Sequence, residues 1–376
     1  MATPPRELAL GIDIGSTKVC AALAGLGAPS RGAPRVALLG AVTVSRAALE
    51  VGTDAAHAVG AIHEAVGALE RTTGVRPASA WLALGTSLRT EVTARGARGS
   101  DDAGQWRDVP AVPEADPAHR CRVAAPGSRM VMHAYERWAG GGARSPVRRP
   151  LSVETVTVSW RELRGAVGAV ARAGLALEDV MLAPSALAEL VLDERERRCG
   201  VALLDVGGSV STTAVVAGSL RHAASTPLGG DFITRALAAE LGVTRGEAER
   251  LKLCAAAVRP EEPLQAWTDA GERRLVSGRE LVAALGHACE RYCTTLRRDI
   301  DLRAAASLVL TGGGATAVGL ERAASATFGL PTRLAQPPGP SLRCDARQAV
   351  AASLALLAVR RTALLAAESP WHAAAS

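Results

Sequence analysis

Two apolar runs separated by a glycine-containing turn occur twice along the chain, which indicates an internal repeat. The runs are Leu8–Ile14 and Val19–Leu23 in the first copy, and Val201–Val206 and Thr213–Val216 in the second. Short apolar runs on either side of Gly and Ser predict two strands joined by a turn. The next-to-last residue of each first run is an aspartate, Asp13 or Asp205. The pattern therefore predicts two hairpins, each with a carboxylate beside its turn.

Helical and strand-like spacings alternate through the rest of the chain. Ala58, Ile62, Val66 and Leu69 recur at helical intervals, whereas residues 153–158 alternate as in a half-buried strand. We expect helices near residues 54–72, 161–173, 185–193, 232–241, 247–256, 278–296, 318–327 and 349–367, and further strands near 80–84, 129–138, 179–182 and 308–310. This order predicts an α/β fold in which a duplicated α/β unit forms two lobes around a cleft.

Shifts in composition suggest where the domains begin and end. Residues 96–117 and 140–150 are rich in Gly, Pro and Arg, which predicts loops within a small inserted subdomain. We expect a first lobe (1–85 and 161–196, with 346–376 packing on it), an inserted subdomain (86–160), the core of a second lobe (197–228 and 304–345) and its peripheral subdomain (229–303). Each lobe would then begin with one of the two hairpins.

Charge and composition exclude several classes of function. The chain has 376 residues, a formal charge of +6 and only two lysines, Lys18 and Lys252. A Walker A loop needs lysine followed by Ser or Thr, whereas Val19 and Leu253 follow here, so a P-loop is excluded. The motifs of protein kinases are also missing. The arginines alternate with acids, as in residues 193–198, instead of clustering with aromatic residues, so we expect no nucleic-acid binding.

The seven cysteines and seven histidines form no pattern typical of a metal or disulfide site. We expect free thiols in a reducing cytoplasm. Residues 1–10 lack the charged start and apolar stretch of a signal peptide. The longest apolar run, Ala349–Val359, is too short to span a bilayer.

The residues of the repeated turns are suited to binding phosphate. Backbone N–H groups and hydroxyls of a Gly/Ser/Thr turn can donate to phosphate oxygens, and glycine allows a close approach. An adjacent carboxylate can hold hydrated Mg²⁺ against the same phosphates. A third turn, Gly312-Gly313-Gly314, follows the strand near residues 308–310 and would let adenosine or phosphate lie against the backbone at the start of a helix. Together the three turns predict a nucleotide site.

These motifs resemble the superfamily of actin, heat-shock chaperones and sugar kinases, and within it the FtsA family of bacterial cell-division proteins. The resemblance extends over residues 8–359 and is weakest at 86–160. The stretches that carry it are Gly11–Cys20, Leu220–His222 with Pro227–Asp231, Glu247–Lys252, and Leu310–Gly314.

The resemblance implies an actin-like fold that binds ATP and Mg²⁺ in its cleft. The first phosphate loop would comprise Asp13, Gly15, Ser16, Thr17 and Lys18, the second Asp205, Gly207 and Gly208, and the adenosine loop Gly312, Gly313 and Gly314. Asp13 and Asp205 would hold the hydrated Mg²⁺, and Glu247 and Lys252 would lie beside the ribose and the adenine. A simpler explanation stays open for the last two, because a capping box with Thr244 accounts for Glu247 and an exposed helix position for Lys252.

The second phosphate loop departs from the family pattern. The family has Asp-Ile-Gly-Gly-Gly-Thr-Thr-Asp where this chain has Asp205-Val206-Gly207-Gly208-Ser209-Val210-Ser211-Thr212, so a glycine, a threonine and the second carboxylate are replaced. In addition, Ala183-Pro184 stands where hydrolysing chaperones have Glu-Pro, a glutamate that FtsA also lacks. Loss of a positioned base costs about 10²–10⁴ in rate, so we expect slow or no ATP hydrolysis.

The resemblance implies a scaffold of the division machinery that is at most a weak ATPase. Its partner would be the C-terminal tail of the tubulin-like FtsZ, docked on the second lobe, and the chain would self-associate into filaments. It would act in the cytoplasm, at the inner face of the cell membrane at the division site. The sequence after residue 367 has no apolar helical face long enough for the membrane helix of FtsA, so membrane contact would be indirect or weak.

Three alternatives stay open. One is an actin-like adaptor of a pilus or secretion system, another is an ATP-dependent small-molecule kinase of the same superfamily, and the third is a degenerate member that no longer binds nucleotide.

Overall fold

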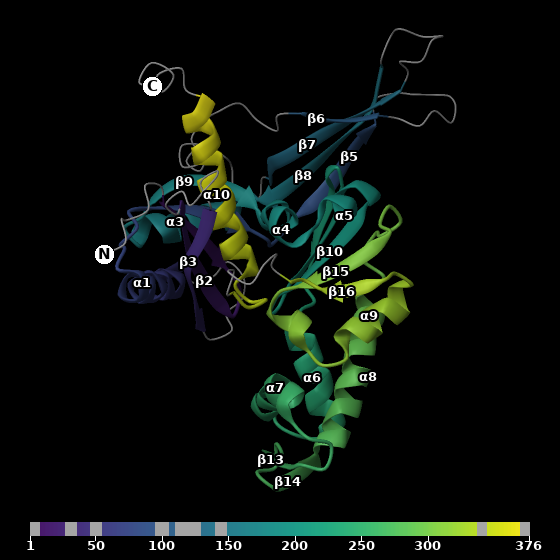
Figure 1. The fold of residues 1–376 in the computed structure, drawn as a ribbon. Coiled ribbons are helices and arrows are strands. Elements are labelled where there is room, and N and C mark those ends of the chain that lie inside the picture. The colour runs from purple at the N-terminus through teal and green to yellow at the C-terminus, as the bar shows by residue number, and fades with distance from the viewer. Residues whose placement is uncertain are drawn as a thin grey trace, which may run out of the picture. The chain divides into compact units, whose positions relative to one another are not determined.

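Each of the two predicted hairpins opens a sheet of its own (Figure 1). The computed structural model describes residues 8–26, 36–45, 55–94, 105–109, 129–139, 149–336 and 344–368. The chain divides into a first unit, Met1–Leu192 with Ser219–Ser225 and Pro337–Ser376, and a second unit, Asp193–Gly218 with Thr226–Gln336. The finer division into four parts stays a prediction.

The sheet of the first unit has the strand order β3-β2-β1-β4-β9. Its strands are β1 (Leu8–Ile14), β2 (Lys18–Leu26), β3 (Val36–Ser45), β4 (Ser79–Leu84) and β9 (Ala176–Leu182). β1 and β2 form the predicted antiparallel hairpin, and β4 and β9 continue the sheet in parallel on the other side of β1. Because β1 is central, its side chains are buried on both faces, as expected for a continuous apolar run.

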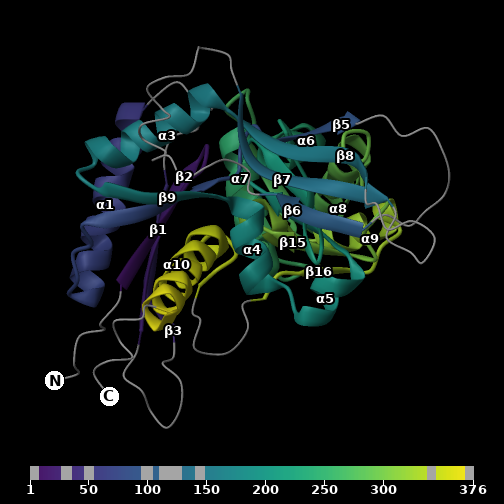
Figure 2. The same ribbon diagram turned by 90° about the horizontal axis from the view of Figure 1, so that it is seen from above.

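Helices cover the two faces of this sheet (Figure 2). They are α1 (Ala55–Thr73), α3 (Trp160–Arg172), α4 (Ala183–Val191) and α10 (Ala349–Glu368). α1 packs on β2 and β3, while α10 lies across β1 and β2. A Cβ on Gly11 would lie 2.3 Å from the carbonyl oxygen of Ala351, so only glycine lets β1 and α10 approach this closely.

The segment predicted as an inserted subdomain contains a separate antiparallel sheet of order β5-β8-β7-β6. Its strands are β5 (Arg89–Ala94), β6 (Gln105–Val109), β7 (Arg129–Ala139) and β8 (Arg149–Ser159). Strand β12 (Ser219–Thr226) is hydrogen-bonded to this region, for example from the Leu88 N–H to Ser225 Oγ and from the Ala223 N–H to Thr90 Oγ1. The Gly-rich stretch at residues 140–148 lies outside the described residues, as do the ends of the chain.

The sheet of the second unit repeats the plan of the first. In its order β12-β11-β10-β15-β16, the last four strands match β2-β1-β4-β9, with one antiparallel hairpin followed by two parallel strands. The strands are β10 (Val201–Val206), β11 (Ser211–Ala217), β15 (Ser307–Thr311) and β16 (Thr332–Leu334). The internal repeat read from the two Asp-bearing turns is therefore a repeat of three-dimensional structure.

Helices α6 (Gly230–Leu241), α7 (Arg245–Cys254), α8 (Gly278–Leu296) and α9 (Leu320–Phe328) pack on one face of this sheet and extend away from it (Figure 1). The second unit also contains α5 (Glu194–Cys199), which contacts β11, short 3₁₀ turns at Ala255–Ala257 and Gly313–Thr316, and a hairpin of β13 (Pro263–Trp267) and β14 (Arg273–Ser277) at the far end. Tyr292, on α8, is the largest fully buried side chain of the chain's described part.

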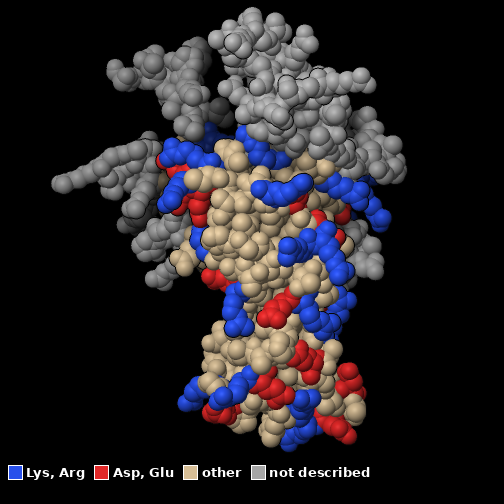
Figure 3. All heavy atoms as spheres, turned by 90° about the vertical axis from the view of Figure 1, so that its right-hand side faces the viewer, with Lys and Arg blue, Asp and Glu red and all other residues tan. Residues whose placement is uncertain are grey.

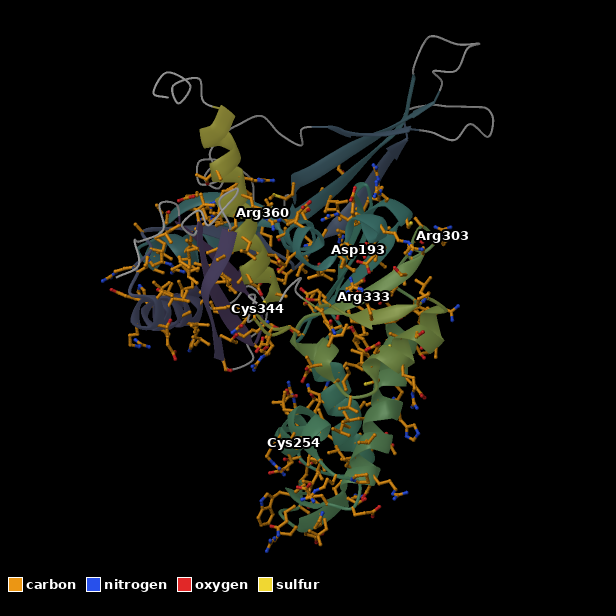
Figure 4. All side chains as sticks on the ribbon, viewed as in Figure 1. Asp193, Cys254, Arg303, Arg333, Cys344 and Arg360 are labelled. Atoms are coloured by element: carbon orange, nitrogen blue, oxygen red, sulfur yellow. The ribbon has the colours of Figure 1, made fainter. Side chains whose placement is uncertain are left out.

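An ion pair joins α5 to β16 in the second unit. The Arg333 guanidinium on β16 donates two 2.7 Å hydrogen bonds to the Glu196 carboxylate, which holds the pKa of that carboxyl below its usual range. Glu196 belongs to the α5 capping box with Asp193, and Figure 4 labels both Asp193 and Arg333. Toward β13 and β14, on the face drawn in Figure 3, acidic and basic side chains are interspersed and not gathered by sign.

Several short strands were missed in the sequence. β3, β12, β16 and the β13–β14 hairpin have no clean alternation, because their faces are only partly buried or they are three to five residues long. The helix expected at 318–327 begins at Leu320 and follows a 3₁₀ turn, so the Gly312-Gly313-Gly314 turn does not lead directly into an α-helix.

We expect Gly11→Ala to lower the free energy of unfolding by about 2–3 kcal/mol, because the added methyl group would overlap the α10 backbone. Chemical denaturation measures the change. Gly60→Ala on α1 is the matched control, since a Cβ there meets nothing within 4 Å and a helical Gly→Ala change should stabilise by about 0.5–1 kcal/mol. Equal effects of the two substitutions would contradict the close packing of β1 and α10.

Candidate functional site

The turn of the first unit is a tight hairpin loop. The Gly15 N–H donates to the Lys18 carbonyl oxygen at 2.9 Å, and Ile14 pairs with Val19 in the antiparallel register. Ser16 and Thr17 therefore form the tip of the loop. The predicted residues Asp13, Gly15, Ser16, Thr17 and Lys18 lie together around this one turn.

Asp13 lies at the end of β1, between Cys20 of β2 and Ala83 of β4. Burial raises the pKa of its carboxyl, and the positive charge of Lys18 partly offsets that effect. The Lys18 ammonium donates a hydrogen bond to the Arg347 carbonyl oxygen just before α10. The turn thus holds a partly buried carboxylate with one cation nearby, an arrangement in which a second cation would be favourable.

The turn of the second unit has the same hydrogen bond at its base. The Gly207 N–H donates to the Val210 carbonyl oxygen at 3.0 Å. Two N–H groups at the start of α6, those of Gly230 and Asp231, donate to the carbonyl oxygens of Gly207 and Gly208 at 2.8 Å each. The α6 N-terminus therefore supports the loop through these carbonyls.

The glycine triplet packs directly against Asp205. Gly312 has φ +85°, and a Cβ there would lie 2.2 Å from Asp205 Oδ1. A Cβ on Gly314 would lie 2.5 Å from Val206 Cγ1, and one on Gly230 would lie 3.5 Å from the Gly314 Cα. The structure thus brings the second predicted phosphate loop, the start of α6 and the predicted adenosine loop together within the second unit.

Lys252 is part of this cluster and is not an ordinary exposed lysine. Its side chain is 9% exposed, and its ammonium donates to the Gly230 carbonyl oxygen at 3.2 Å and to Thr234 Oγ1 at 2.7 Å. It also forms a 2.7 Å ion pair with Glu249. The helix-surface explanation of Lys252 is therefore wrong.

Glu247 lies on the first turn of α7, the helix that also carries Lys252. Its N–H donates to Thr244 Oγ1 at 3.2 Å, and its carboxylate accepts from the Arg250 guanidinium at 2.9 Å. The Thr244 N–H, which a complete capping box would pair with Glu247, donates instead to the Trp267 carbonyl oxygen. The predicted capping box is thus only half formed, and the Glu247 side chain is bound to Arg250.

Two buried hydroxyl groups that the sequence did not predict as a pair are hydrogen-bonded next to the second phosphate loop. Tyr292 Oη and Ser211 Oγ are 2.6 Å apart, and Ser211 is the first residue of β11 after the loop. Burial raises the pKa of Tyr292, which keeps the phenol neutral. The Tyr292 ring also contacts Phe232 near the start of α6, with ring centroids 6.3 Å apart. No spacing could indicate this pair, because its members are 81 positions apart.

The position that carries glutamate in hydrolysing relatives is apolar and enclosed here. Ala183 begins α4 and is 2% exposed, and a Cβ on Gly85 would lie 3.3 Å from the Ala183 Cβ. Pro184 occupies the first turn, where its missing N–H costs nothing.

Neither a metal cluster nor a disulfide occurs among the described residues. No group of three or more His, Cys, Asp or Glu side chains there could hold a metal ion directly. The cysteines described are free thiols, namely Cys20, Cys199, Cys254, Cys289, Cys293 and Cys344, of which Figure 4 labels Cys254 and Cys344. No helix in this part of the chain is long and apolar enough to cross a membrane.

Substituting Gly312 should damage the site through steric overlap. We expect Gly312→Ala to lower the free energy of unfolding by at least about 1 kcal/mol more than Gly329→Ala, as measured by chemical denaturation. Both glycines have positive φ, but only a Cβ at 312 would meet the Asp205 carboxylate, whereas one at 329 meets nothing within 4 Å. The pair separates backbone strain from contact with Asp205, and similar losses in both variants would refute that contact.

Comparison with known proteins supports the resemblance drawn from the motifs. The family model "Cell division protein FtsA" matches residues 202–355. The cell division protein FtsA of Pseudomonas aeruginosa is 27% identical over 88% of this chain and 83% of its own length. FtsA of Escherichia coli is 26% identical over 88% of this chain and 84% of its own length.

Solved structures identify the fold. The type IV pilus biogenesis complex PilM–PilN contains a chain that aligns with 94% of this one at a TM-score of 0.62 and 17% identity, over 99% of its own length. MreB5 of Spiroplasma citri bound to AMPPNP aligns with 97% of this chain and 100% of its own at a TM-score of 0.53 and 12% identity. These structures confirm the predicted actin-like α/β fold. By sequence the chain is similar to cell division proteins of the FtsA family, and by fold to actin-like proteins.

Proposed function

We propose that this chain is an ATP-binding, actin-like scaffold of bacterial cell division that hydrolyses ATP slowly or not at all. The observation that carries this proposal is the packing of the Gly312–Gly314 turn and the start of α6 around the end of β10, where an added Cβ at Gly312 would overlap Asp205 and one at Gly229 would overlap the Gly208 backbone. Glycine turns gathered in this way can bind phosphate through backbone N–H groups.

The nucleotide would contact the same residues that the sequence pointed to. The turns at Gly207-Gly208 and Gly312–Gly314 would hold phosphate and adenosine, and the Asp13 turn would hold phosphate in the same way. Because the N–H groups of Gly230 and Asp231 already donate to loop carbonyls, α6 would act by shaping the loop. Lys252 would act by bracing the first turn of α6 near the adenosine.

Asp13 and Asp205 would hold a hydrated Mg²⁺. The two residues suit a hydrated cation, because each is a single carboxylate beside a turn and no cluster of direct ligands surrounds either among the described residues. A bound Mg²⁺ would neutralise phosphate charge, and water molecules would bridge it to the carboxylates. Burial raises the pKa of Asp13, and a nearby cation would favour its ionised form.

Slow hydrolysis would follow from the enclosed methyl group of Ala183. A water molecule attacking the terminal phosphate needs a group that orients it and accepts its proton, and alanine offers neither. A Cβ added at Gly85 would already lie 3.3 Å from Ala183, so little room is left there for a side chain that could replace the glutamate. ATP would then act as a bound ligand that stabilises one conformation.

The division role rests on sequence, because fold alone does not separate the alternatives. Identity to FtsA proteins reaches 26–28% over long alignments, while the pilus protein of similar fold is 17% identical. We therefore propose the FtsZ C-terminal tail as the partner, docked on the second unit, with self-association into filaments at the cytoplasmic face of the membrane. An adaptor of pilus assembly is the second candidate, supported by the likeness to PilM.

Mg-ATP binding with an Asp13→Asn variant tests the nucleotide proposal. We expect the parent protein to bind Mg-ATP by isothermal titration calorimetry and Asp13→Asn to bind at least about 10-fold more weakly. The same variant should be as stable as the parent or more stable near neutral pH. Since the folded-state pKa of Asp13 is raised, its ionisation costs stability as pH rises above the ordinary value of an aspartate, and asparagine avoids that cost.

Asp179→Asn on β9 of the same sheet is the control, and we expect it to leave the affinity for Mg-ATP unchanged. A parent protein that binds no Mg-ATP would rule out the nucleotide proposal. Turnover of several ATP molecules per second would contradict the proposed slow hydrolysis.

A peptide titration tests the partner. We expect saturable binding of a peptide with the sequence of the FtsZ C-terminal tail from the same organism, and no binding of a scrambled peptide of equal charge. Binding of the PilN-type partner peptide in place of the FtsZ tail would favour the pilus adaptor and overturn the division role.

A further inference from the structure

Asp205 is flanked on both sides by threonines on neighbouring strands. In the register of the sheet it pairs with Thr212 of the antiparallel strand β11 and with Thr311 of the parallel strand β15. Adjacent strands lie about 4.8 Å apart, so side chains that share a face at one register position are neighbours. The three residues therefore form a row of hydroxyl, carboxylate and hydroxyl across the sheet.

The row lies on the face of the sheet opposite to α6, α8 and α9. Leu204, Val206 and Leu310 belong to the apolar cluster that includes residues of α6, α8 and α9. Successive side chains of a strand point to opposite faces, so Asp205 and Thr311 point away from that cluster. Thr311 therefore shares a face of the sheet with Asp205, the proposed Mg²⁺ ligand.

The Thr311 hydroxyl has no hydrogen-bond partner in the described part of the chain, although its residue is fully buried. A buried hydroxyl without a partner destabilises a fold, and valine would fill the same volume without that cost. Such a group in a native protein calls for an explanation such as a bound water or ion. Its position beside Asp205 supplies one.

We propose that Thr311 is a further binding residue of the nucleotide site, whose hydroxyl hydrogen-bonds to a water molecule of the hydrated Mg²⁺ held by Asp205. The proposal rests on the nucleotide function proposed above. The proposal also fits the sequence of the loop, in which Thr212 replaces the family's second carboxylate. Asp205 is then the one negative charge in the row, and hydroxyl groups beside it would bind the cation through its water molecules.

Thr311→Val tests the proposal with two measurements that should move in opposite directions. We expect Mg-ATP affinity to fall about 3- to 10-fold, the size expected for one hydrogen bond, while the melting temperature stays the same or rises. ATP titrated in EDTA should bind the variant and the parent equally. Thr311→Ser keeps the hydroxyl and should retain most of the affinity for Mg-ATP.

Thr157→Val is the control, a buried threonine on β8 whose hydroxyl donates to the Arg89 carbonyl oxygen. It should lose stability and keep its affinity. Mg-ATP affinity equal to the parent's in Thr311→Val would overturn the inference, as would a marked loss of stability or failure to fold, since either would reveal a structural partner of the hydroxyl. An equal loss of affinity in EDTA would overturn the role of the cation. Failure of the parent to bind Mg-ATP would instead refute the nucleotide function.

Discussion

The second unit depends on a few positions where backbone segments approach other atoms so closely that only glycine fits. Gly312, Gly314 and Gly229 each face an atom that would lie within 2.5 Å of an added Cβ. The glycine triplet and the start of α6 can therefore meet the Gly207 turn at the end of β10, next to Asp205. The first unit uses the same device at Gly11, where β1 passes beneath α10.

The polar groups near these turns are arranged at some expense of stability. Burial raises the pKa of Asp13, and the Thr311 hydroxyl is buried without a partner in the described structure. Both lysines of the chain lie beside the turns and hydrogen-bond to backbone carbonyl oxygens, Lys18 to Arg347 and Lys252 to Gly230. Groups that weaken a fold are typical of binding sites, where a ligand offsets the cost.

The second phosphate loop, which departs from the family pattern, is held in place by contacts with α8 and α6. Ser211, at the second threonine position of the family's loop, is hydrogen-bonded to Tyr292, and the ring of that tyrosine contacts Phe232 at the start of α6. The loop is thus anchored to α8 on one side and to the N–H groups of α6 on the other. A fully buried Tyr–Ser pair keeps a backbone in place without a third loop glycine.

The sequence by itself determined the duplicated α/β plan, the two Asp-bearing hairpins and the glycine triplet, because these depend on local spacing and on residues with unusual backbone freedom. It also placed Lys252 and Glu247 near the site, but only through family resemblance. The tertiary structure alone decided that Lys252 is buried and bonded to Thr234, that Glu247 pairs with Arg250, and that Tyr292 supports Ser211. These contacts join residues on different elements or opposite sides of a turn, and neither spacing nor composition determines which side chains meet when β10, β15, α6 and α8 pack together.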